Sequence, residues 1–146
     1  MKPTFGRKVQ NGDYQLRKGA YAIVLNDSKD HVLTVHNGRG FHFLPGGGME
    51  KNEDAYRCLE REMLEETGYR LKVGTYIGTA YYYFISSKGE YILSDGYFYS
   101  ARILEKVQEP IEEDHFLEWV LLSEMDKLFF YKHQVWAVKE VVGLEE

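Results

Sequence analysis

One predicted helix limits the folds open to this chain more than any other segment, because its apolar face runs into a group of carboxylates. The stretch REMLEETG (61–68) spaces Glu62, Glu65 and Glu66 at i, i+3 and i+4, so the three side chains share one side of a helix. Like charges at this spacing repel one another and weaken an isolated helix. Either water screens the three carboxylates, or a positively charged group belongs beside them.

The apolar residues of the same helix favour the second interpretation. At about 100° per residue, the acids continue the apolar stripe of the first turns instead of lying opposite to it. Partly buried carboxylates are costly unless they are paired or bound to a metal. The alternative is a solvated patch at a frayed helix end, with Arg61 and Glu65 as a plain i,i+4 pair. Three residues form the stripe within about 60° of Glu62: Ala55, Cys58 and Leu59.

The segments on either side of this helix have the composition of β-strands. Val, Ile, Tyr and Phe, which favour extended backbone, are concentrated in them, and Gly, Asn, Ser or Pro separates one segment from the next. The strands that we expect are 19–27, 31–36, a short extended segment at 41–45, 71–86, 91–104 and 116–122.

The helix itself has recognisable ends. A glycine-rich loop (46–52) precedes it, Asn52 is a suitable N-cap, and Gly68 stands where a C′ glycine stops a helix. The helical segments that we expect are 53–67, a short turn at 123–126 with a capping-box pattern, and an amphipathic helix at 133–143 that ends at Gly143.

Length and composition indicate one folded domain, residues 1–146. The chain has 146 residues, 44% of them hydrophobic and 28% charged, which is enough to bury a core. Strands on both sides of a helix predict an α/β fold in which a mixed β-sheet lies between helices, an α/β/α layering. The formal net charge of −5 argues against a nucleic-acid groove. It permits a phosphorylated small substrate, provided that a metal supplies the local positive charge.

The cysteine content and the hydropathy pattern indicate a cytoplasmic protein. Cys58 is the only cysteine, so it forms no intramolecular disulfide; we interpret it as a small core residue, against the alternative of a nucleophile. The N-terminal residues contain no apolar core of a signal peptide, and the longest apolar run, AYAIVL, is too short to span a bilayer.

The acids of the helix belong to a longer pattern of fixed spacing. Gly47 is followed by five residues and Glu53, and then by seven residues and the run REMLEETGY (61–69). This stretch resembles the Nudix box of the MutT/Nudix hydrolases, G-x5-E-x7-R-E-U-x-E-E-x-G-U, where U is a bulky apolar residue. All fixed polar and glycine positions are present; Tyr69 departs mildly from the last position because it carries a hydroxyl. The preceding LPGG (44–47) also matches the usual approach to the box.

The resemblance implies a Nudix-type α/β/α sandwich and a metal-dependent hydrolase of nucleoside diphosphates linked to another group. In that family, water attacks phosphorus in the diphosphate bridge. Because the substrate and this helix face are both anionic, a divalent cation must lie between them, and carboxylate oxygens suit Mg²⁺, with Mn²⁺ as a substitute. The implied partner is a small nucleotide-type diphosphate. Homodimers are common in the family, and the sequence leaves the oligomeric state open.

The family pattern also implies a role for each position of the box. Glu62, Glu65 and Glu66 match the metal-binding acids, and Gly47 matches the glycine whose backbone carbonyl often adds a ligand. The positions that match residues supporting the site are Glu53, Arg61 and Gly68.

The resemblance leaves the general base open. In the family it is a box glutamate, here Glu62 or Glu65, or an acid in a later loop. Glu113, in the acidic loop EPIEEDH, lies six residues before Trp119, like the downstream glutamate that some members use. Glu112 is its close competitor. The alternative for both loop acids is an ordinary solvated surface.

Four residues are candidates for substrate binding. Arg39 lies in the turn after a predicted strand, where it can reach a phosphate, and His42 stands where many members carry Trp before the box. Tyr81 and Tyr83 share one face of a predicted strand, where a base can stack. The alternatives are a solvated turn for the first and ordinary aromatic packing for the tyrosines.

Other functions agree with parts of the sequence. A nucleotide-binding or regulatory module with weak catalysis would keep the fold, but such members usually lose box acids, and this chain keeps them all. A dinucleoside polyphosphate hydrolase remains an alternative substrate class. The features that mark the NADH, ADP-ribose and CoA subgroups are absent. An isoprenyl diphosphate isomerase needs a positioned catalytic cysteine, whereas Cys58 sits inside the predicted helix.

Overall fold

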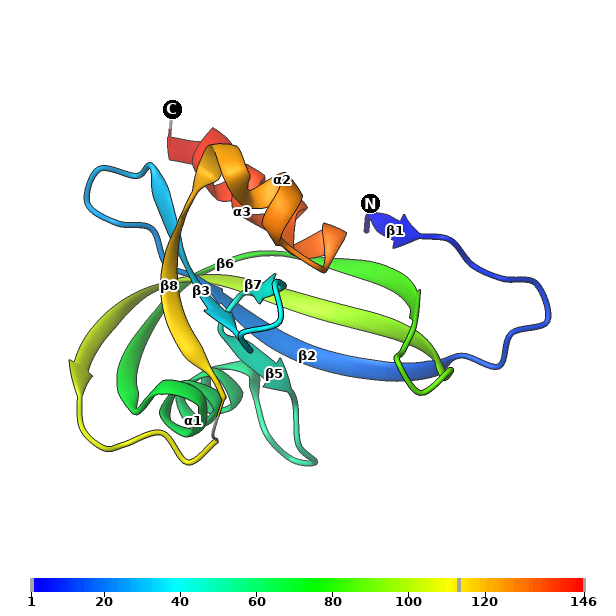
Figure 1. The fold of residues 1–146 in the computed structure, drawn as a ribbon, viewed down its shortest axis with the longest axis horizontal. Helices are drawn as coiled ribbons and strands as arrows, with labels where there is room; N and C mark the ends of the chain where they lie inside the picture. The colour runs from blue at the N-terminus through cyan, green and yellow to red at the C-terminus, as the bar shows by residue number, and fades with distance from the viewer. Residues whose placement is uncertain (1, 113, 146) are drawn as a thin grey trace.

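The computed structural model describes residues 2–112 and 114–145, which form two β-sheets flanked by helices (Figure 1). The larger sheet has the strand order β1-β6-β7-β2-β5, and the smaller sheet the order β4-β3-β8. The strands are β1 (Thr4–Gly6), β2 (Gln15–Ile23), β3 (His31–His36), β4 (His42–Phe43), β5 (Gly46–Gly48), β6 (Tyr69–Ile85), β7 (Tyr91–Lys106) and β8 (Phe116–Leu121). The helices are α1 (Ala55–Thr67), a 3-10 turn (Leu122–Glu124) leading into α2 (Met125–Leu128), and α3 (Lys132–Glu145).

The larger sheet is mixed, as the sequence predicts. β2 pairs in parallel with β7 and antiparallel with β5, while β6 and β7 form a long antiparallel hairpin and β1 joins β6 in parallel. Register shifts interrupt the β6–β7 pairing near Val73 and Tyr76, and such irregularities increase the local twist. The hairpin is accordingly strongly curved at that end (Figure 1).

The smaller sheet is built around β3, the strand that follows β2 in the chain. β3 pairs antiparallel with both β4 and β8, and the Thr34 hydroxyl donates to the Glu118 carbonyl oxygen at 2.8 Å. The two sheets meet where the Leu33 N–H donates to the Val24 carbonyl oxygen at 2.9 Å. This junction places β4, which leads directly into β5, beside the larger sheet.

Side chains of β2 alternate between two buried cores, which sets the layering. Ala20 and Ala22 of β2, and Val24 just after it, belong to the core that α1 covers, whereas Ile23 belongs to the core that α3 covers. Strand residues of successive number point to opposite faces, so one central strand serves both cores. The α/β/α arrangement expected from the sequence is thereby confirmed. The residues that α1 contributes to its core are Ala55, Cys58, Leu59 and Met63.

The start of α1 differs from the sequence prediction. Asp54, not Asn52, is the N-cap: its carboxylate accepts the Arg57 N–H at 2.8 Å. Asn52 instead has φ 67° in the turn before the helix, where the Glu53 N–H donates to the Glu50 carbonyl oxygen at 3.1 Å. Asparagine tolerates this left-handed conformation, which explains why a residue with good capping chemistry is used for the turn. Glu53 therefore lies outside the helix.

Other boundaries also differ. Gly46–Gly48, expected as loop, pairs with β2 as strand β5, because extended glycine backbone can approach a neighbouring strand closely. The short helix α2 forms, but no side chain caps it. Among the further differences, β2 starts at Gln15 and ends at Ile23, β1 has no counterpart among the expected strands, and α3 continues past Gly143 to Glu145.

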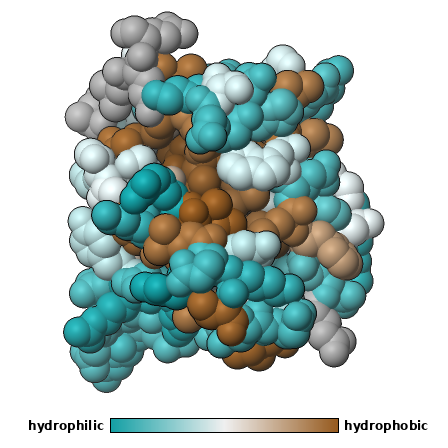
Figure 2. Space-filling view, turned by 90° about the vertical axis from the view of Figure 1, so that its left-hand side faces the viewer, coloured by the Kyte–Doolittle hydropathy of each residue, from teal (hydrophilic) through white to brown (hydrophobic). Residues whose placement is uncertain are grey.

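One face of the molecule has an apolar hollow. Figure 2 shows hydrophobic residues gathered at its centre and hydrophilic residues around them. Two adjoining cavities of about 650 and 510 Å³ lie on this side, where the β2–β3 connection meets the curved ends of β6 and β7. Within the described ranges, no helix is both long and apolar enough to cross a bilayer.

Candidate active site

The three glycines of β5 bring backbone against the acidic end of α1. The pairing of Gly47 with Ala20 holds this strand at the edge of the larger sheet. A Cβ added to Gly47 would lie 2.7 Å from Cδ of Glu62, so only glycine fits without movement. Gly46 has φ 138°, a conformation that side-chain-bearing residues rarely adopt. Gly46 and Gly47 are therefore required by close approach to β2 and to a carboxylate.

Arg61 joins the loop before α1 to the helix. Its guanidinium makes a two-pronged contact with Glu53, with Nε–Oε2 at 2.7 Å and Nη2–Oε1 at 2.9 Å. Nη2 also donates to the Gly48 carbonyl oxygen at 3.1 Å. Paired hydrogen bonds of this kind are strong and fix orientation. The contact holds the pKa of Glu53 at about 2 and raises that of Arg61.

The same guanidinium reaches two of the three helix acids. Arg61 Nη1 donates to Glu62 Oε1 at 2.9 Å and to Glu65 Oε2 at 3.2 Å. Burial raises the pKa of Glu62, and the nearby Arg61 opposes that rise. One cation thus partly relieves the repulsion between Glu62 and Glu65.

Glu66 is the acid that Arg61 does not contact within the described residues. It is 8% exposed, and the Gly46 N–H donates to its Oε1 at 3.2 Å. Burial raises the pKa of Glu66 well above its usual range, opposed by that hydrogen bond and reinforced by the charges of Glu62 and Glu112. An ionised carboxylate at this position needs a cation beside it.

A fourth carboxylate comes from the loop between β7 and β8. The N–H groups of Ile111 and Glu112 both donate to the Glu65 carbonyl oxygen at 2.9 Å, and the Val107 N–H donates to that of Gly68 at 2.9 Å. The loop thus satisfies carbonyl groups that the end of α1 leaves without helical partners. This docking brings a Glu112 carboxylate oxygen within 4.8 Å of those of Glu62 and Glu65.

Glu112 also faces a second neighbour in the same loop. Its carboxylate lies 3.6 Å from Nε2 of His115, and oxygen or nitrogen atoms of Glu66, Glu112 and His115 lie within 4.8 Å of one another. Glu113, the other loop acid proposed from the sequence, lies outside the described residues. The structure places Glu112 beside the helix acids.

Gly68 and Cys58 have the structural surroundings expected for them. Gly68 has φ 80°, and its N–H donates to the Leu64 carbonyl oxygen at 2.9 Å, which ends α1. Cys58 is buried beneath β5, where its Sγ–H lies 3.4 Å from the Gly47 carbonyl oxygen. Burial raises the pKa of the Cys58 thiol to about 12. Such a thiol stays protonated and buried, which agrees with a core residue.

A cavity of about 230 Å³ opens beside Glu66 and the β5 glycines. Tyr21 and Tyr131 line it and also line an adjoining cavity of about 240 Å³ that contains Arg17 and Lys18. The cavity beside Glu66 therefore adjoins a second cavity that two basic residues of β2 line. The other residues of the first cavity are Val35, Phe43, Leu44, Gly46, Gly47, His115 and Gln134.

Two of the proposed substrate residues lie on the other face of the larger sheet. Tyr81 is covered by Lys2, whose Nζ lies 4.0 Å from the ring centre, and Tyr83 packs edge-on against Tyr14 at 4.9 Å. Tyr82, between them, faces α3 and packs against Tyr131. The prediction that these tyrosines lie on a strand is correct, but successive side chains of a strand point to opposite faces. Tyr82, and not Tyr81 or Tyr83, therefore lies on the face toward the cavities.

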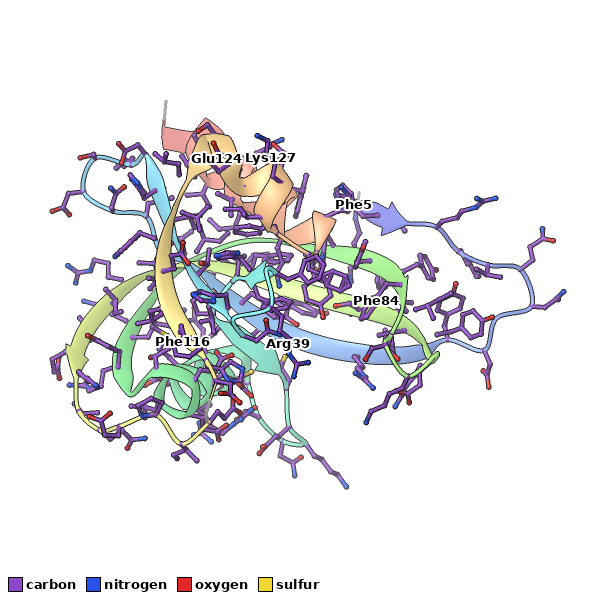
Figure 3. The ribbon with its side chains drawn as sticks, viewed as in Figure 1. Phe5, Arg39, Phe84, Phe116, Glu124 and Lys127 are labelled. Carbon is purple, nitrogen blue, oxygen red and sulfur yellow. The ribbon has the colours of Figure 1, made fainter. Side chains whose placement is uncertain are left out.

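His42 and Arg39 also lie outside the lining of these two cavities. Nε2 of His42 lies 3.1 Å from Glu118 Oε2, and Nε2 of His36 lies at the same distance from that oxygen. The Gly38 N–H donates to Nδ1 of His36, so the proton of a neutral His36 is on Nε2, facing Glu118. With the proton of His36 in this position, we interpret His36, His42 and Glu118 as a hydrogen-bonded group and not as a metal site. Arg39 is exposed and extends from the β3–β4 loop on the side where β5 lies (Figure 3).

Comparison with known proteins supports the resemblance seen in the box. The sequence profile of the NUDIX domain matches residues 15–139. The chain belongs to the Nudix family. Two Bacillus subtilis (strain 168) proteins, both provisionally named 8-oxo-dGTP diphosphatase, are 39% identical over 61 residues and, for YtkD, 38% identical over 81 residues. These matches cover 42% and 56% of this chain and 41% and 49% of the relatives, so the chain spans less than half of either.

Solved Nudix structures share the fold over nearly the whole chain. A NUDIX hydrolase from Nitrosomonas europaea has a TM-score of 0.71 at 18% identity and covers 90% of this chain and 92% of its own. A MutT NUDIX hydrolase from Burkholderia pseudomallei has a TM-score of 0.64 at 25% identity, covering 87% of this chain and 98% of its own. The predicted Nudix-type sandwich is therefore confirmed.

Sequence reasoning missed the residues that shape the space beside the Nudix box. Tyr21, Tyr131 and Gln134 are far apart in the chain and meet only because β2 and the start of α3 adjoin. Neither periodicity nor the box pattern refers to them. His115 carried one available signal, since it lies three residues after Glu112 in the acidic loop, but its type alone did not separate it from other histidines.

Proposed function

We propose that this Nudix chain is a metal-dependent hydrolase of the phosphoanhydride bond in nucleoside di- or triphosphate substrates, with water attacking phosphorus. The observation that carries the proposal is the convergence of Glu62, Glu65, Glu66 and Glu112 beside the Gly47 backbone. An anionic substrate is attracted to an anionic cluster only through a cation. The proposal also agrees with the names of the Bacillus subtilis relatives, which refer to a nucleotide diphosphatase.

The residues present fit a divalent metal. Carboxylate oxygens are hard donors suited to Mg²⁺ or Mn²⁺, and the buried Glu66 lacks an ion-pair partner among the described residues. The ligands that we assign are the carboxylates of Glu62, Glu65 and Glu66 and the carbonyl of Gly47. A bound divalent ion would neutralise charge on the diphosphate and lower the pKa of a coordinated water.

The chain's own groups then position the reaction. Arg61 and Glu53 hold the glycine strand against α1, and Gly68 ends the helix where the Glu112 loop docks. We assign Glu112 as the leading candidate for the base that accepts the proton of water, because it faces the helix acids from a separate element. Glu62 and Glu65 remain alternatives for that role, and Glu113 remains a sequence-based candidate.

The two cavities along β2 offer a place for the substrate. The space beside Glu66 is walled by aromatic rings, which suits a base, and the adjoining space contains Arg17 and Lys18, which suit phosphate oxygens. Arg39, exposed on the same side, can add a further phosphate contact. The proposal assigns no role to Tyr81, Tyr83 or His42. Lys2 covers the ring of Tyr81, Tyr14 packs against Tyr83, and Glu118 pairs with Nε2 of His42.

The decisive experiment is a hydrolysis screen of wild-type protein and Glu66→Gln over nucleoside triphosphates, nucleoside diphosphate sugars and dinucleoside polyphosphates, with Mg²⁺ or Mn²⁺. We expect hydrolysis by the wild type and a loss of at least about 100-fold in Glu66→Gln with an unchanged circular dichroism spectrum. Equal turnover by both proteins would reject the metal-site assignment. A folded wild type that binds Mn²⁺ but hydrolyses none of these substrates would instead favour the nucleotide-binding module.

A further inference from the structure

The outer strands of the two sheets differ in how well they are protected against pairing with another chain. β1, β4 and β5 have three, two and three residues, and β5 consists of glycines alone. β8, in contrast, has six residues, FLEWVL, and contains no proline, glycine or lysine. Short strands, prolines and lysines are common means by which an exposed strand edge avoids association. The edge of β8 lacks each of these protections.

The hydrogen bonds between β3 and β8 determine which backbone groups of β8 point outward. The Leu122 N–H donates to the Asp30 carbonyl oxygen at 2.9 Å, and these two positions continue the antiparallel register of β3 and β8. Hydrogen-bonded pairs alternate along an antiparallel ladder, so the even-numbered residues of β8 bond to β3. The N–H and C=O groups of Leu117, Trp119 and Leu121 consequently face the open edge. Among the described residues, no other element bonds to these groups.

Exposed apolar side chains accompany this open row of backbone groups. Trp119 and Leu121 are 42% and 44% exposed, and they share one face of the strand with Leu117. A cavity of about 650 Å³ lies beside Trp119, so space remains next to the indole. Glu118, the one charged residue of the strand, points to the opposite face, where it pairs with a histidine of β3 and another of β4.

We propose that β8 pairs in antiparallel fashion with β8 of a second copy of this chain, about a two-fold axis at Trp119. In that register Trp119 lies opposite Trp119 of the second copy, and Leu117 lies opposite Leu121. Each outward N–H then meets an outward carbonyl oxygen, because the open row is symmetric about its central residue. The two three-stranded sheets join into one continuous sheet.

The symmetry of this row favours a second copy over a segment of another protein. A two-fold interface requires a surface that is complementary to itself. β8 meets this requirement in its side chains as well as in its backbone: apolar residues face apolar residues, and Glu118 lies opposite Val120. No like charges therefore face each other across the pairing. The inference is independent of the proposed function, since no residue assigned to the metal site belongs to β8.

The test is the oligomeric state of the intact chain, measured by sedimentation velocity from about 1 to 100 µM. We expect a dimer at the upper concentrations. The dimer Kd should rise at least about 30-fold in Trp119→Lys, because a lysine on an edge strand opposes pairing. Trp119→Pro removes only an outward N–H, so it should fold and be monomeric. The matched control is Ile85→Lys, at a residue of β6 that is 53% exposed, and it should leave Kd unchanged.

Cysteine variants test the register of the pairing. Trp119→Cys places two thiols opposite each other across the two-fold axis, at a Cα separation that a disulfide can span. We expect mild oxidation to cross-link this variant and not Leu121→Cys, because position 121 lies opposite position 117. Cys58 is buried and does not interfere.

Each outcome supports or overturns the inference. A wild type that stays monomeric at about 100 µM overturns it and leaves this edge to a strand of another protein. A dimer whose Kd is the same in Trp119→Lys, or one that oxidation cross-links at position 121 and not at 119, also overturns it, since another surface or register then forms the dimer. If Trp119→Pro does not fold, the lysine and cysteine variants decide. The hydrolysis screen tests the proposed function separately.

Discussion

Removing the Arg61 guanidinium should loosen the glycine strand from α1 and lower stability in a pH-dependent way. In Arg61→Ala, the two bonds to Glu53 and the bond to the Gly48 carbonyl are lost together. The side chains of Arg61 and Glu53 are only 24% and 10% exposed, so the pair lies between a surface pair and a buried one. Charge-assisted bonds contribute about 1.5–3 kcal/mol and exposed pairs about 0.2–1 kcal/mol.

From this geometry we expect Arg61→Ala to lose about 2–3 kcal/mol at pH 7, or about 4–10 °C in Tm. A double-mutant cycle with Glu53→Gln should give a coupling free energy of about 2 kcal/mol. Measurements with a chelator present keep bound metal from masking the loss. The matched control is Arg57→Ala on the same helix, whose side chain is 78% exposed and whose pair with Asp54 spans 4.0 Å. It should change Tm by less than about 2 °C.

The pH dependence provides a second check. The folded pKa of Glu53 is about 2, below the ordinary value of 4.5, because Arg61 stabilises the ionised form. A lowered carboxyl pKa stabilises the folded state above pH 4.5, and this contribution disappears as pH falls toward 2. The coupling free energy should therefore shrink by more than about half between pH 5 and pH 3. A coupling near zero at pH 7, or one that does not change with pH, would refute the reasoning.

Two further substitutions test other parts of the site. Gly47→Ala places a methyl group 2.7 Å from Cδ of Glu62, so we expect at least about a tenfold loss of hydrolysis together with a lower Tm; unchanged values for both would show that β5 moves freely. Glu112→Gln should lower kcat at least about tenfold while leaving the metal affinity of the folded protein within a few-fold. The control Glu109→Gln, in the same loop but 86% exposed, should behave as the wild type; equal effects of the two loop variants would reject Glu112 as base.

The layers of the fold were predictable because local patterns agree with tertiary packing. β3 was predicted at its observed limits, His31–His36, since its residues favour strands and polar turns flank it. The strand β5 was not, because three glycines have no strand preference of their own, and only the neighbouring β2 makes them extended. β1 is three residues long and forms only where β6 offers a free edge, which no local signal encodes.

The acids of the box were predictable for a different reason. Their i, i+3 and i+4 spacing has the same meaning on any helix, so the spacing alone puts Glu62, Glu65 and Glu66 on one face. The position of Glu112 depends instead on how its loop docks against carbonyl groups at the end of α1, which no local pattern of the sequence encodes.

Arg61 also sharpens what the acidic cluster requires. Its guanidinium contacts Glu53, Glu62 and Glu65 and lies 3.6 Å from Glu50, so a single cation is already shared among four carboxylates. Among the described residues, Glu66 receives only the Gly46 N–H, and burial disfavours its charged form. Arg61 therefore offsets the negative charge of the acids that hold the loop in place. Within the part of the chain that the structure describes, no cation offsets the charge of Glu66, which lies beside the cavity. A positive charge delivered there from outside would stabilise ionised Glu66 more than any other acid of the group, which is why Glu66→Gln is the sharpest test of the metal site.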